Sequence, residues 1–243
     1  MGGPRSISER LSTLPPGRHL LPSEFVANNQ RARILYATSE LVAERGYQKT
    51  TIELIAKSAR VALRTFYEHF ASKEECFLAA FDADLEAAAD VFNELLDPNE
   101  PWPEQIAIGL EIFLELVVAE PARAKLCLVA SQSAGSAAFS RYQETLERVA
   151  PKLREGRRLN PMSKKMPDGL EVAIAGGIAW LVHQRLVRGE GGGDHLRDLL
   201  PEIIQITLTP YVGEERARQT ARAAANRESV VLPKVRGDRN RGM

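Results

Sequence analysis

The residues best suited to chemistry are polar and basic side chains clustered between positions 51 and 73. They are Thr51, Arg64, Thr65, Tyr67, His69 and Lys73, with the apolar Leu63 among them. Arginine can bind guanine through two hydrogen bonds in the major groove, whereas lysine and short polar side chains bind phosphate oxygens. We therefore take this set as candidate DNA contacts. Arg64 is the first choice for reading a base, and a phosphate contact explains it equally well.

Two short helices joined by a tight turn would hold these side chains in place. Thr50 and Glu53 have the spacing of a capping box, which predicts the start of the first helix. Apolar residues then recur at helical spacing, at Ile52, Ile55, Ala56 and Ala59. Arg60 and Val61 form the predicted turn. The first helix is therefore expected to end just before position 60.

The second helix is predicted over residues 62 to 70 and is roughly 13 Å long at 1.5 Å per residue. That length fits within a major groove. Ser72 and Glu75 form a second capping box, which starts a third helix over residues 73 to 96. A supporting helix over residues 23 to 45 ends at Gly46.

This arrangement is a helix-turn-helix, in which the second helix enters the major groove. Its pattern resembles that of the TetR family of bacterial transcriptional regulators. The matching residues are Gly46, Tyr47, Thr50, Thr51, Ile55, Ala56, Ala59, Val61, Thr65, Phe66, Tyr67, His69, Phe70, Lys73 and Glu74. The detailed resemblance covers residues 28 to 87, and beyond them only length and helical pattern agree. It implies that Tyr67, His69 and Lys73 contact phosphate. We expect Phe66 and Phe70, as apolar rings, to hold the three helices together.

Two positions depart from the family pattern. The turn usually carries glycine where this chain has Arg60, and a non-glycine residue in the left-handed conformation costs about 1 kcal/mol. The next helix usually opens with serine or threonine where this chain has Ala62, and losing that cap costs about 1 kcal/mol. Ala62 also lacks a hydroxyl group that could bind phosphate.

Composition limits the class of protein. The chain has 243 residues, of which 44% are hydrophobic, enough for a packed core. Lys and Arg total 32, as do Asp and Glu, which argues against a binder driven by overall charge but not against a site-specific one. Cys76 and Cys127 are expected to be reduced, buried thiols. No apolar signal segment opens the chain, and the longest apolar run, residues 172 to 182, is short of the ~20 needed to span a membrane. We expect a soluble, cytoplasmic protein.

The sequence contains no pattern typical of an enzyme. The glycine-rich stretch over residues 189 to 194 lacks the lysine of a phosphate loop and lies between predicted helices, so it is a linker. The histidines have no metal-ligand spacing; they are His19, His69, His183 and His195. We expect no catalysis, no metal and no cofactor.

The chain divides into four predicted regions. Residues 1 to 22 form an arm, either a solvated tail or a DNA contact. Residues 23 to 72 form the DNA-binding unit, and residues 73 to 212 a helical effector-binding and dimerisation domain. Residues 213 to 243 form a polar, basic tail, whose first part can extend a helix through residue 225. Further helices are predicted over residues 103 to 119, 122 to 133, 136 to 153, 168 to 188 and 195 to 208, with a loop over residues 154 to 167.

The resemblance implies a ligand cavity and a dimer bundle in the C-terminal region. An ordinary core or surface position is the alternative for each of the candidate ligand contacts, which are Trp102, Phe113, Cys127, Gln132, Arg141 and Tyr142. The small apolar centre of the helix over residues 168 to 188, around Gly176 and Gly177, is the expected dimer seam.

The sequence thus predicts an all-α protein, with a three-helix DNA-binding unit followed by a helical ligand-binding and dimerisation domain. The expected function is site-specific transcriptional regulation by a homodimer bound to a double-stranded DNA operator. We expect a repressor that a small apolar or amphipathic ligand releases from its operator. The alternative is a DNA-binding protein that is independent of ligands or controlled by a protein partner. An enzyme on a helical scaffold is the remaining rival, and an activity screen would reveal it.

Overall fold

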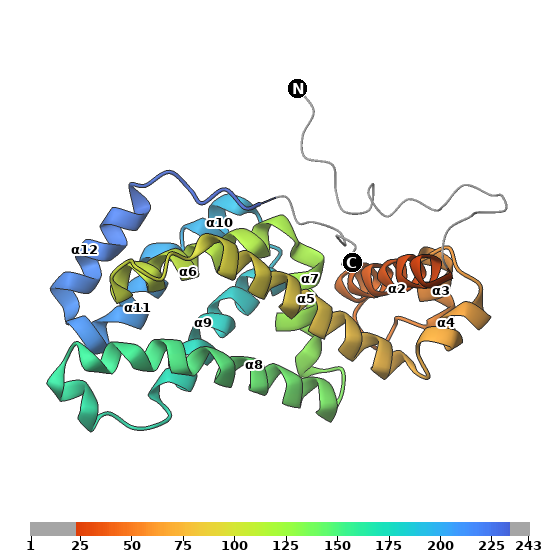
Figure 1. Cartoon of the computed structure of the whole chain (residues 1–243), viewed down its shortest axis with the longest axis horizontal. Coiled ribbons are helices and arrows are strands. Elements are labelled where there is room, and N and C mark those ends of the chain that lie inside the picture. Colours follow the sequence, from red (N-terminus) through yellow and green to blue (C-terminus); the bar gives the residue numbers. More distant parts are fainter. Residues whose placement is uncertain (1–22, 234–243) are drawn as a thin grey trace.

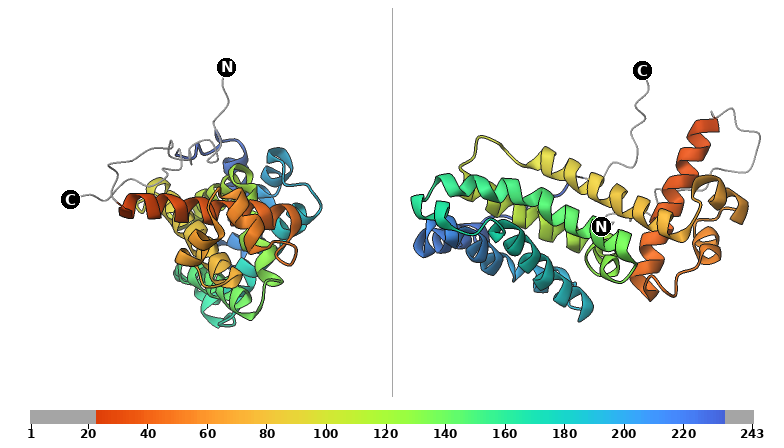
Figure 2. Two further views of the ribbon diagram at one scale, coloured as in Figure 1. Left: turned by 90° about the vertical axis from the view of Figure 1, so that its right-hand side faces the viewer. Right: turned by 90° about the horizontal axis from the view of Figure 1, so that it is seen from below.

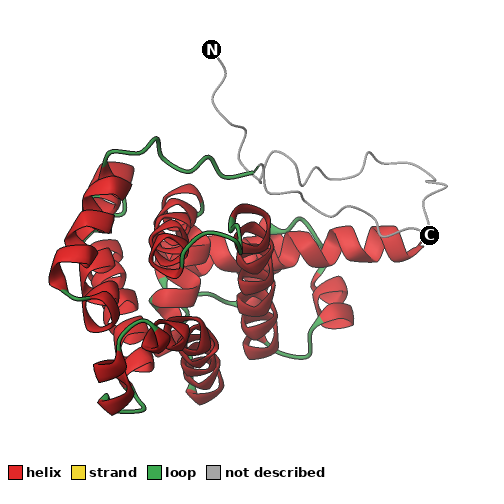
Figure 3. Cartoon of the chain, turned by 60° about the vertical axis from the view of Figure 1, so that its left-hand side comes forward, coloured by secondary structure: helices red, strands yellow, loops and turns green. Residues whose placement is uncertain are grey.

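The computed structural model describes residues 23 to 233. Over that range the chain forms α-helices and short 3₁₀ segments without a β-strand, which confirms the predicted all-α fold (Figures 1 and 3). The predicted N-terminal arm and the last ten residues of the predicted tail lie outside the described residues.

The predicted DNA-binding unit contains three helices and the start of a fourth. They are α2 (Ser23–Arg45), α3 (Ile52–Ser58), α4 (Leu63–His69) and α5 (Lys73–Leu95). Ile34, Ile55, Phe66 and Phe77 are completely buried where these helices meet. The helices therefore bury the apolar faces that their spacing in the sequence indicates.

The cap of α3 differs from the prediction by one residue. Thr51 is the N-cap, and its hydroxyl accepts a hydrogen bond from the Leu54 amide at 3.3 Å. Thr50 is buried, and its hydroxyl donates to the Gly46 carbonyl at 2.9 Å. The predicted capping box of Thr50 and Glu53 is wrong because the preceding turn uses the Thr50 hydroxyl.

The cap of α5 agrees with the prediction. Ser72 is the N-cap and accepts from the Glu75 amide at 3.0 Å, while the Glu75 carboxylate accepts from the Ala71 amide at 2.7 Å. This capping box ends the recognition segment and fixes where α5 begins.

The turn between α3 and α4 has the left-handed geometry expected from the family pattern. Arg60 has φ 54° and is the only non-glycine residue with a positive φ in the described part of the chain. Burial lowers the pKa of Arg33, and the nearby positive charge of Arg60 lowers it further. Arg60 thus combines backbone strain with like-charge repulsion.

The C-terminal domain is a helical bundle beside and beyond α5 (Figures 1 and 2). Its α-helices are α6 (Trp102–Ala119), α7 (Pro121–Leu128), α8 (Ser136–Arg154), α9 (Leu170–Val187), α10 (Gly193–Arg197), α11 (Leu200–Val212) and α12 (Glu214–Ala225). Three 3₁₀ segments lie among them within the described range: Ala130–Gln132, Glu155–Arg158 and Pro161–Lys165.

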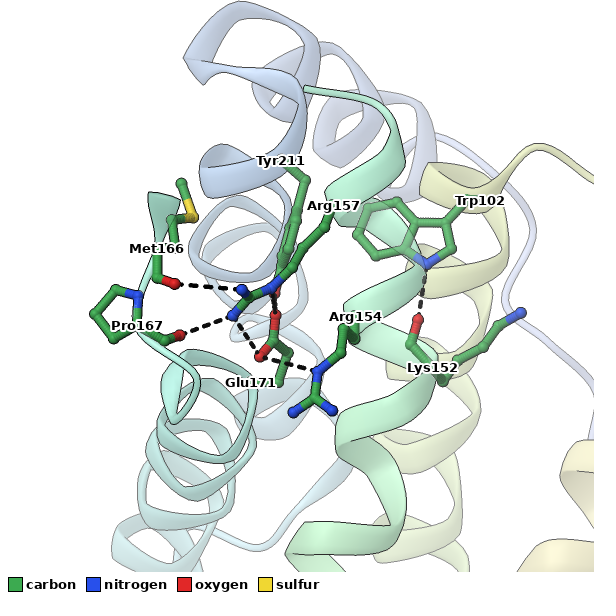
Figure 4. Close-up of polar contacts among 8 residues, drawn as sticks. All are labelled: Trp102, Lys152, Arg154, Arg157, Met166, Pro167, Glu171 and Tyr211. Carbon is green, nitrogen blue, oxygen red and sulfur yellow. Dashed lines mark hydrogen bonds and ion pairs between the residues drawn. The ribbon is translucent and has the colours of Figure 1, made fainter. Parts of the chain in front are cut away.

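Three predicted elements differ from the structure. The helix predicted over residues 122 to 133 is divided into α7 and the 3₁₀ segment Ala130–Gln132. The helix predicted over residues 195 to 208 is broken into α10 and α11. The predicted loop over residues 154 to 167 is held in 3₁₀ turns, because Arg157 donates to both oxygens of Glu171 at 2.6 and 2.9 Å and to the Pro167 carbonyl at 2.7 Å (Figure 4). Tyr211 of α11 donates to the same carboxylate at 3.1 Å. These bonds tie the segment between α8 and α9 to α11.

Glu171 is fully buried yet ionised. Burial opposes its charge, but hydrogen bonds from Arg157, its own amide and Tyr211 outweigh that effect and lower its pKa. Removing one partner of such a buried pair is costly, since the remaining charge loses its compensation.

Helix α9 is long and apolar enough to cross a membrane by length and composition, and 39% of it is buried in the fold. The core helix of a soluble protein passes the same test. The exposed residues of α9 include Gly177, Trp180 and Val187. They leave an apolar surface without a partner in the single described chain.

We predict that Arg60→Gly stabilises the protein by about 1 kcal/mol, because glycine adopts φ 54° without strain. Thermal unfolding measures the change. Arg60→Ala is the matched control, since it removes the charge beside Arg33 but keeps a side chain in the strained turn. Equal stability of the two variants would show that backbone strain at position 60 is negligible.

Candidate nucleic-acid interface and ligand cavity

Helix α4 presents one face to solvent at the end of the molecule opposite α12 (Figure 1). Leu63, Arg64 and Tyr67 are exposed on it, and the Arg64 side chain is 90% exposed. Phe66 and Phe70 are buried on the opposite face, where their rings contact each other. The outer face of α4 is therefore free to approach DNA.

The remaining candidate contacts surround this face. Thr51 is exposed at the start of α3, and its hydroxyl can still donate to a phosphate while it caps the helix. Thr65 and His69 are half-buried. The structure thus brings these residues to one end of the DNA-binding unit.

Glu68 is an acidic neighbour that the sequence analysis did not single out. Its carboxylate accepts from Arg64 Nε at 3.2 Å, and both side chains are exposed. An exposed pair of this kind contributes only about 0.3–0.5 kcal/mol. Arg64 can therefore leave Glu68 for DNA at little cost.

Contacts within the protein hold the Lys73 side chain in place, so it is not a freely moving phosphate ligand. Its Nζ donates to the carbonyls of Tyr47 and Thr50, both at 3.0 Å, and lies 4.1 Å from the centre of the Tyr47 ring. The ammonium group has three donors, so one stays available for phosphate. Lys73 also fixes the turn that carries Thr51 against the start of α5.

A cavity of about 640 Å³ lies among α5, α6, α7, α8 and α9. Its size is within the range of small-molecule sites, and most of its lining is apolar. Phe113, Cys127 and Tyr142, three of the predicted ligand contacts, are among the lining residues. Their contact with a ligand stays a prediction.

The other three predicted ligand contacts lie outside the cavity lining. The Trp102 indole donates to the Lys152 carbonyl at 2.9 Å and packs edge-on against Tyr211 (Figure 4). Gln132 is exposed and donates to the Leu128 carbonyl at 2.9 Å. Arg141 pairs with Asp82 at 3.4 Å. Each has intramolecular partners that turn it away from the cavity.

One end of the cavity carries charged residues that the sequence analysis missed. Arg123 Nε lies 3.1 Å from Asp84 Oδ1 and 4.0 Å from Glu120 Oε2. Ser39 of α2 donates to the other oxygen of Asp84 at 3.3 Å. Burial raises the pKa of Asp84 to about 6, although Arg123 and Ser39 favour its charged form. This end of the cavity therefore touches the DNA-binding unit through α2.

The signal for this end was present in the sequence. Asp84 follows Phe81 by one helical turn and therefore interrupts the apolar face of α5. A carboxylate on a buried face is informative, because such groups rarely lie there without a partner or a role.

The opposite end of the cavity is basic. Arg148 and Lys152 of α8 line it together with Asn93 and Gln105. Asp84 and Asn93 are nine residues apart on α5, which places the two ends about 14 Å apart at 1.5 Å per residue. Within the described residues, no group of His, Cys, Asp and Glu side chains is arranged to hold a metal ion.

We predict that the Asp84 carboxyl titrates with a pKa of about 6 and that Arg123→Gln raises this value, because the variant removes the nearby positive charge. Carboxyl ¹³C NMR across a pH series measures both. The pKa of Asp84 in the folded state lies above the ordinary 3.8. The protonated carboxyl therefore contributes its full stabilisation below pH 3.8, and this contribution is lost as the pH rises through about 6. Arg141→Gln, which removes the partner of Asp82, is the control. Titration of Asp84 near 3.8 would contradict the described burial.

Comparison with known proteins supports the interpretation of the N-terminal unit as a helix-turn-helix of a transcriptional regulator. Residues 34–80 match the sequence model described as "Bacterial regulatory proteins, tetR family". The chain is 32% identical over 87 residues to the uncharacterized HTH-type transcriptional regulator YhgD of Bacillus subtilis, which covers 36% of this chain and 46% of that protein. The matched region is thus about half the length of this curated relative.

Solved structures share the fold over both domains. The fatty acid degradation regulator FadR from Bacillus halodurans superposes with a TM-score of 0.65 at 19% identity, over 74% of this chain and 94% of that one. The FadR structure from Bacillus subtilis in complex with stearoyl-CoA gives a TM-score of 0.58 at 20% identity, over 75% of this chain and 98% of that one. At these identities the likeness shows the fold alone, and the proteins concerned are regulators rather than enzymes. Residues 34–80 thus match the helix-turn-helix of the TetR family of bacterial regulatory proteins, and the described chain shares its two-domain fold with these regulators.

Proposed function

We propose that this protein is a homodimeric, site-specific DNA-binding transcriptional regulator, a repressor that a small apolar or amphipathic ligand releases from its operator. The observation that carries the proposal is α5, whose first turns belong to the core of the DNA-binding unit and whose later turns line the cavity. A ligand that tilts α5 would therefore move the recognition helix. A regulator of this kind acts on DNA in the cytoplasm.

The apolar surface of α9 supports the homodimer. Trp180 is 52% exposed and Val187 60% exposed, and a β-carbon added at Gly177 would meet nothing within 4 Å in the single described chain. A helix-turn-helix dimer reads two half-sites about 34 Å apart. Burying this surface between two chains would set that spacing.

The cavity supports the ligand. Its lining includes four aromatic side chains, Phe81, Phe92, Phe113 and Tyr142, and has charged residues at both ends. An amphipathic molecule matches that lining. The FadR structure with stearoyl-CoA shows that a protein of this fold can hold such a molecule.

We predict that Trp180→Glu and Gly177→Trp each weaken the dimer and lower operator affinity, because a charge or a bulky ring disturbs the α9 surface. Analytical ultracentrifugation and DNA titration measure the two effects. Val231→Glu, at an exposed apolar residue outside the helices, is the control. Dimers of unchanged stability in both α9 variants would place the interface elsewhere.

We predict that Arg64→Ala lowers affinity for the operator by ~1–3 kcal/mol and affinity for random DNA much less, if Arg64 reads a base. The operator is first selected by sequencing genomic fragments that the purified protein retains. Lys73→Ala should weaken binding to both DNAs and also lower the melting temperature, since Nζ holds two backbone carbonyls. An equal loss on both DNAs for Arg64→Ala would instead indicate a phosphate contact.

The test of ligand control fills the cavity. Gly109 of α6 lines it, and a β-carbon added there would meet only Phe92, at 3.9 Å. We predict that Gly109→Met keeps operator affinity but removes the release caused by decanol, decanoate or decyltrimethylammonium. Gly169→Met, at an open position outside the cavity lining, should respond like the wild type. If none of these compounds or others that bind the protein alters its DNA affinity, the ligand-independent alternative is correct.

A further inference from the structure

The charges along the cavity are unevenly distributed. Its α7 end holds two carboxylates, Asp84 and Glu120, against one guanidinium, Arg123. The Asp84 side chain is only 9% exposed and that of Glu120 25% exposed, so water compensates this excess of negative charge only partly. The end of the cavity nearest the DNA-binding unit is therefore an acidic, partly desolvated site beside an apolar space.

Arg123 compensates the two carboxylates unequally. Its Nε lies within hydrogen-bond range of Asp84 but 4.0 Å from Glu120, and Glu120 has no closer cation among the described residues. Burial raises the pKa of both carboxyl groups despite Arg123. The thiol of Cys127, which lines the same end, also has a raised pKa, first through burial and then through the charge of Asp84. Burial is the largest cause of all three shifts, and the charge of a nearby carboxylate adds to each of them.

Aromatic rings complete this environment. Phe81 is one helical turn before Asp84 on α5, and Phe113 and Tyr142 line the cavity from α6 and α8. Aromatic faces attract cations, most strongly when the cation is desolvated. Carboxylates and rings together favour a positively charged group over a neutral or negative one.

We propose that the cavity takes an amphipathic cation, with its ammonium group at Asp84 and Glu120 and its apolar body directed along α5 toward Asn93. This inference rests on the proposed function, since it names the class of ligand for the same cavity. A carboxylate-headed ligand would meet two like charges at this end and is restricted to the basic end, beside Arg148 and Lys152.

The proposal also explains how binding would reach DNA. Asp84 accepts a hydrogen bond from Ser39 of α2 and pairs with Arg123 of α7, so one carboxylate joins three helices at the junction of the two domains. A cation that competes with Arg123 for Asp84 loosens the link between α5 and α7. The first helix of the DNA-binding unit lies directly against that link.

The test compares decyltrimethylammonium, decanol and decanoate, three probes of equal chain length, by calorimetry with the full chain at pH 7.5. The expected order of affinity is cation, alcohol, carboxylate, with at least a tenfold difference between the first and the last. Glu120→Gln and Asp84→Asn should each lower the affinity for the cation at least fivefold without weakening that for decanoate. Glu214→Gln, at an exposed carboxylate of α12 outside the cavity lining, should leave the affinity for the cation unchanged.

The outcomes separate this proposal from the proposed function. Equal or tighter binding of decanoate, binding of no probe, or a cation affinity that survives both carboxylate substitutions would overturn the cation assignment. Glu120→Gln keeps the test decisive if Asp84→Asn fails to fold, because Glu120 is the less buried of the two. Selective retention of operator DNA, measured without any probe, decides separately whether the protein is a DNA-binding regulator.

Discussion

Helix α5 belongs to the hydrophobic core of the DNA-binding unit at one end and to the wall of the cavity at the other, and this constraint determines how the rest of the molecule can behave. Phe77 and Phe81 of its first turns are completely or almost completely buried in the DNA-binding unit, where each contributes about 1.5–3 kcal/mol. Leu85 and Phe92 of its later turns line the cavity. The cavity wall therefore cannot tilt without carrying the DNA-binding unit with it.

Helix α7 reinforces this constraint. Leu126 is completely buried in the same core as Ile34 of α2, and Arg123 pairs with Asp84 of α5. Two helices, α5 and α7, thus join the DNA-binding unit to the C-terminal domain. Figures 1 and 2 show this arrangement from the side and along the long axis. An effector at the junction of α5 and α7 would act on both contacts together.

The far side of the C-terminal domain is held more firmly. Three buried carboxylates pair with arginines from other segments: Glu171 with Arg157, Glu115 with Arg197, and Glu111 with Arg227. These pairs connect α9 to the segment after α8, α6 to α10, and α6 to the segment after α12. Breaking such a pair leaves a buried charge uncompensated and costs about 3–5 kcal/mol. Movement in response to a ligand is therefore expected along α5 and α7, where the structure encloses a cavity.

The sequence predicted the elements better than the orientation of their side chains. Apolar spacing and capping residues located α2, α5 and the helix-turn-helix, because burial and caps act locally. Thr50 was misassigned because its neighbour Thr51 is equally able to cap a helix, and the choice depends on the Gly46 carbonyl. Helical phase alone could not show that Trp102 turns toward Tyr211 while Phe113 faces the cavity. Asp84 was overlooked for a related reason, since its partners come from α2 and α7, far away in sequence.

The central claim is that the cavity and the DNA-binding face are coupled through α5 and α7. Reciprocal titration tests it most directly, using the DNA fragment that the protein selects and decyltrimethylammonium as the cavity probe. The account predicts that saturating probe lowers DNA affinity, that saturating DNA lowers probe affinity, and that both fall by the same factor, about 5–150-fold for a coupling of 1–3 kcal/mol. Probe that binds in the cavity and leaves DNA affinity unchanged would contradict the account.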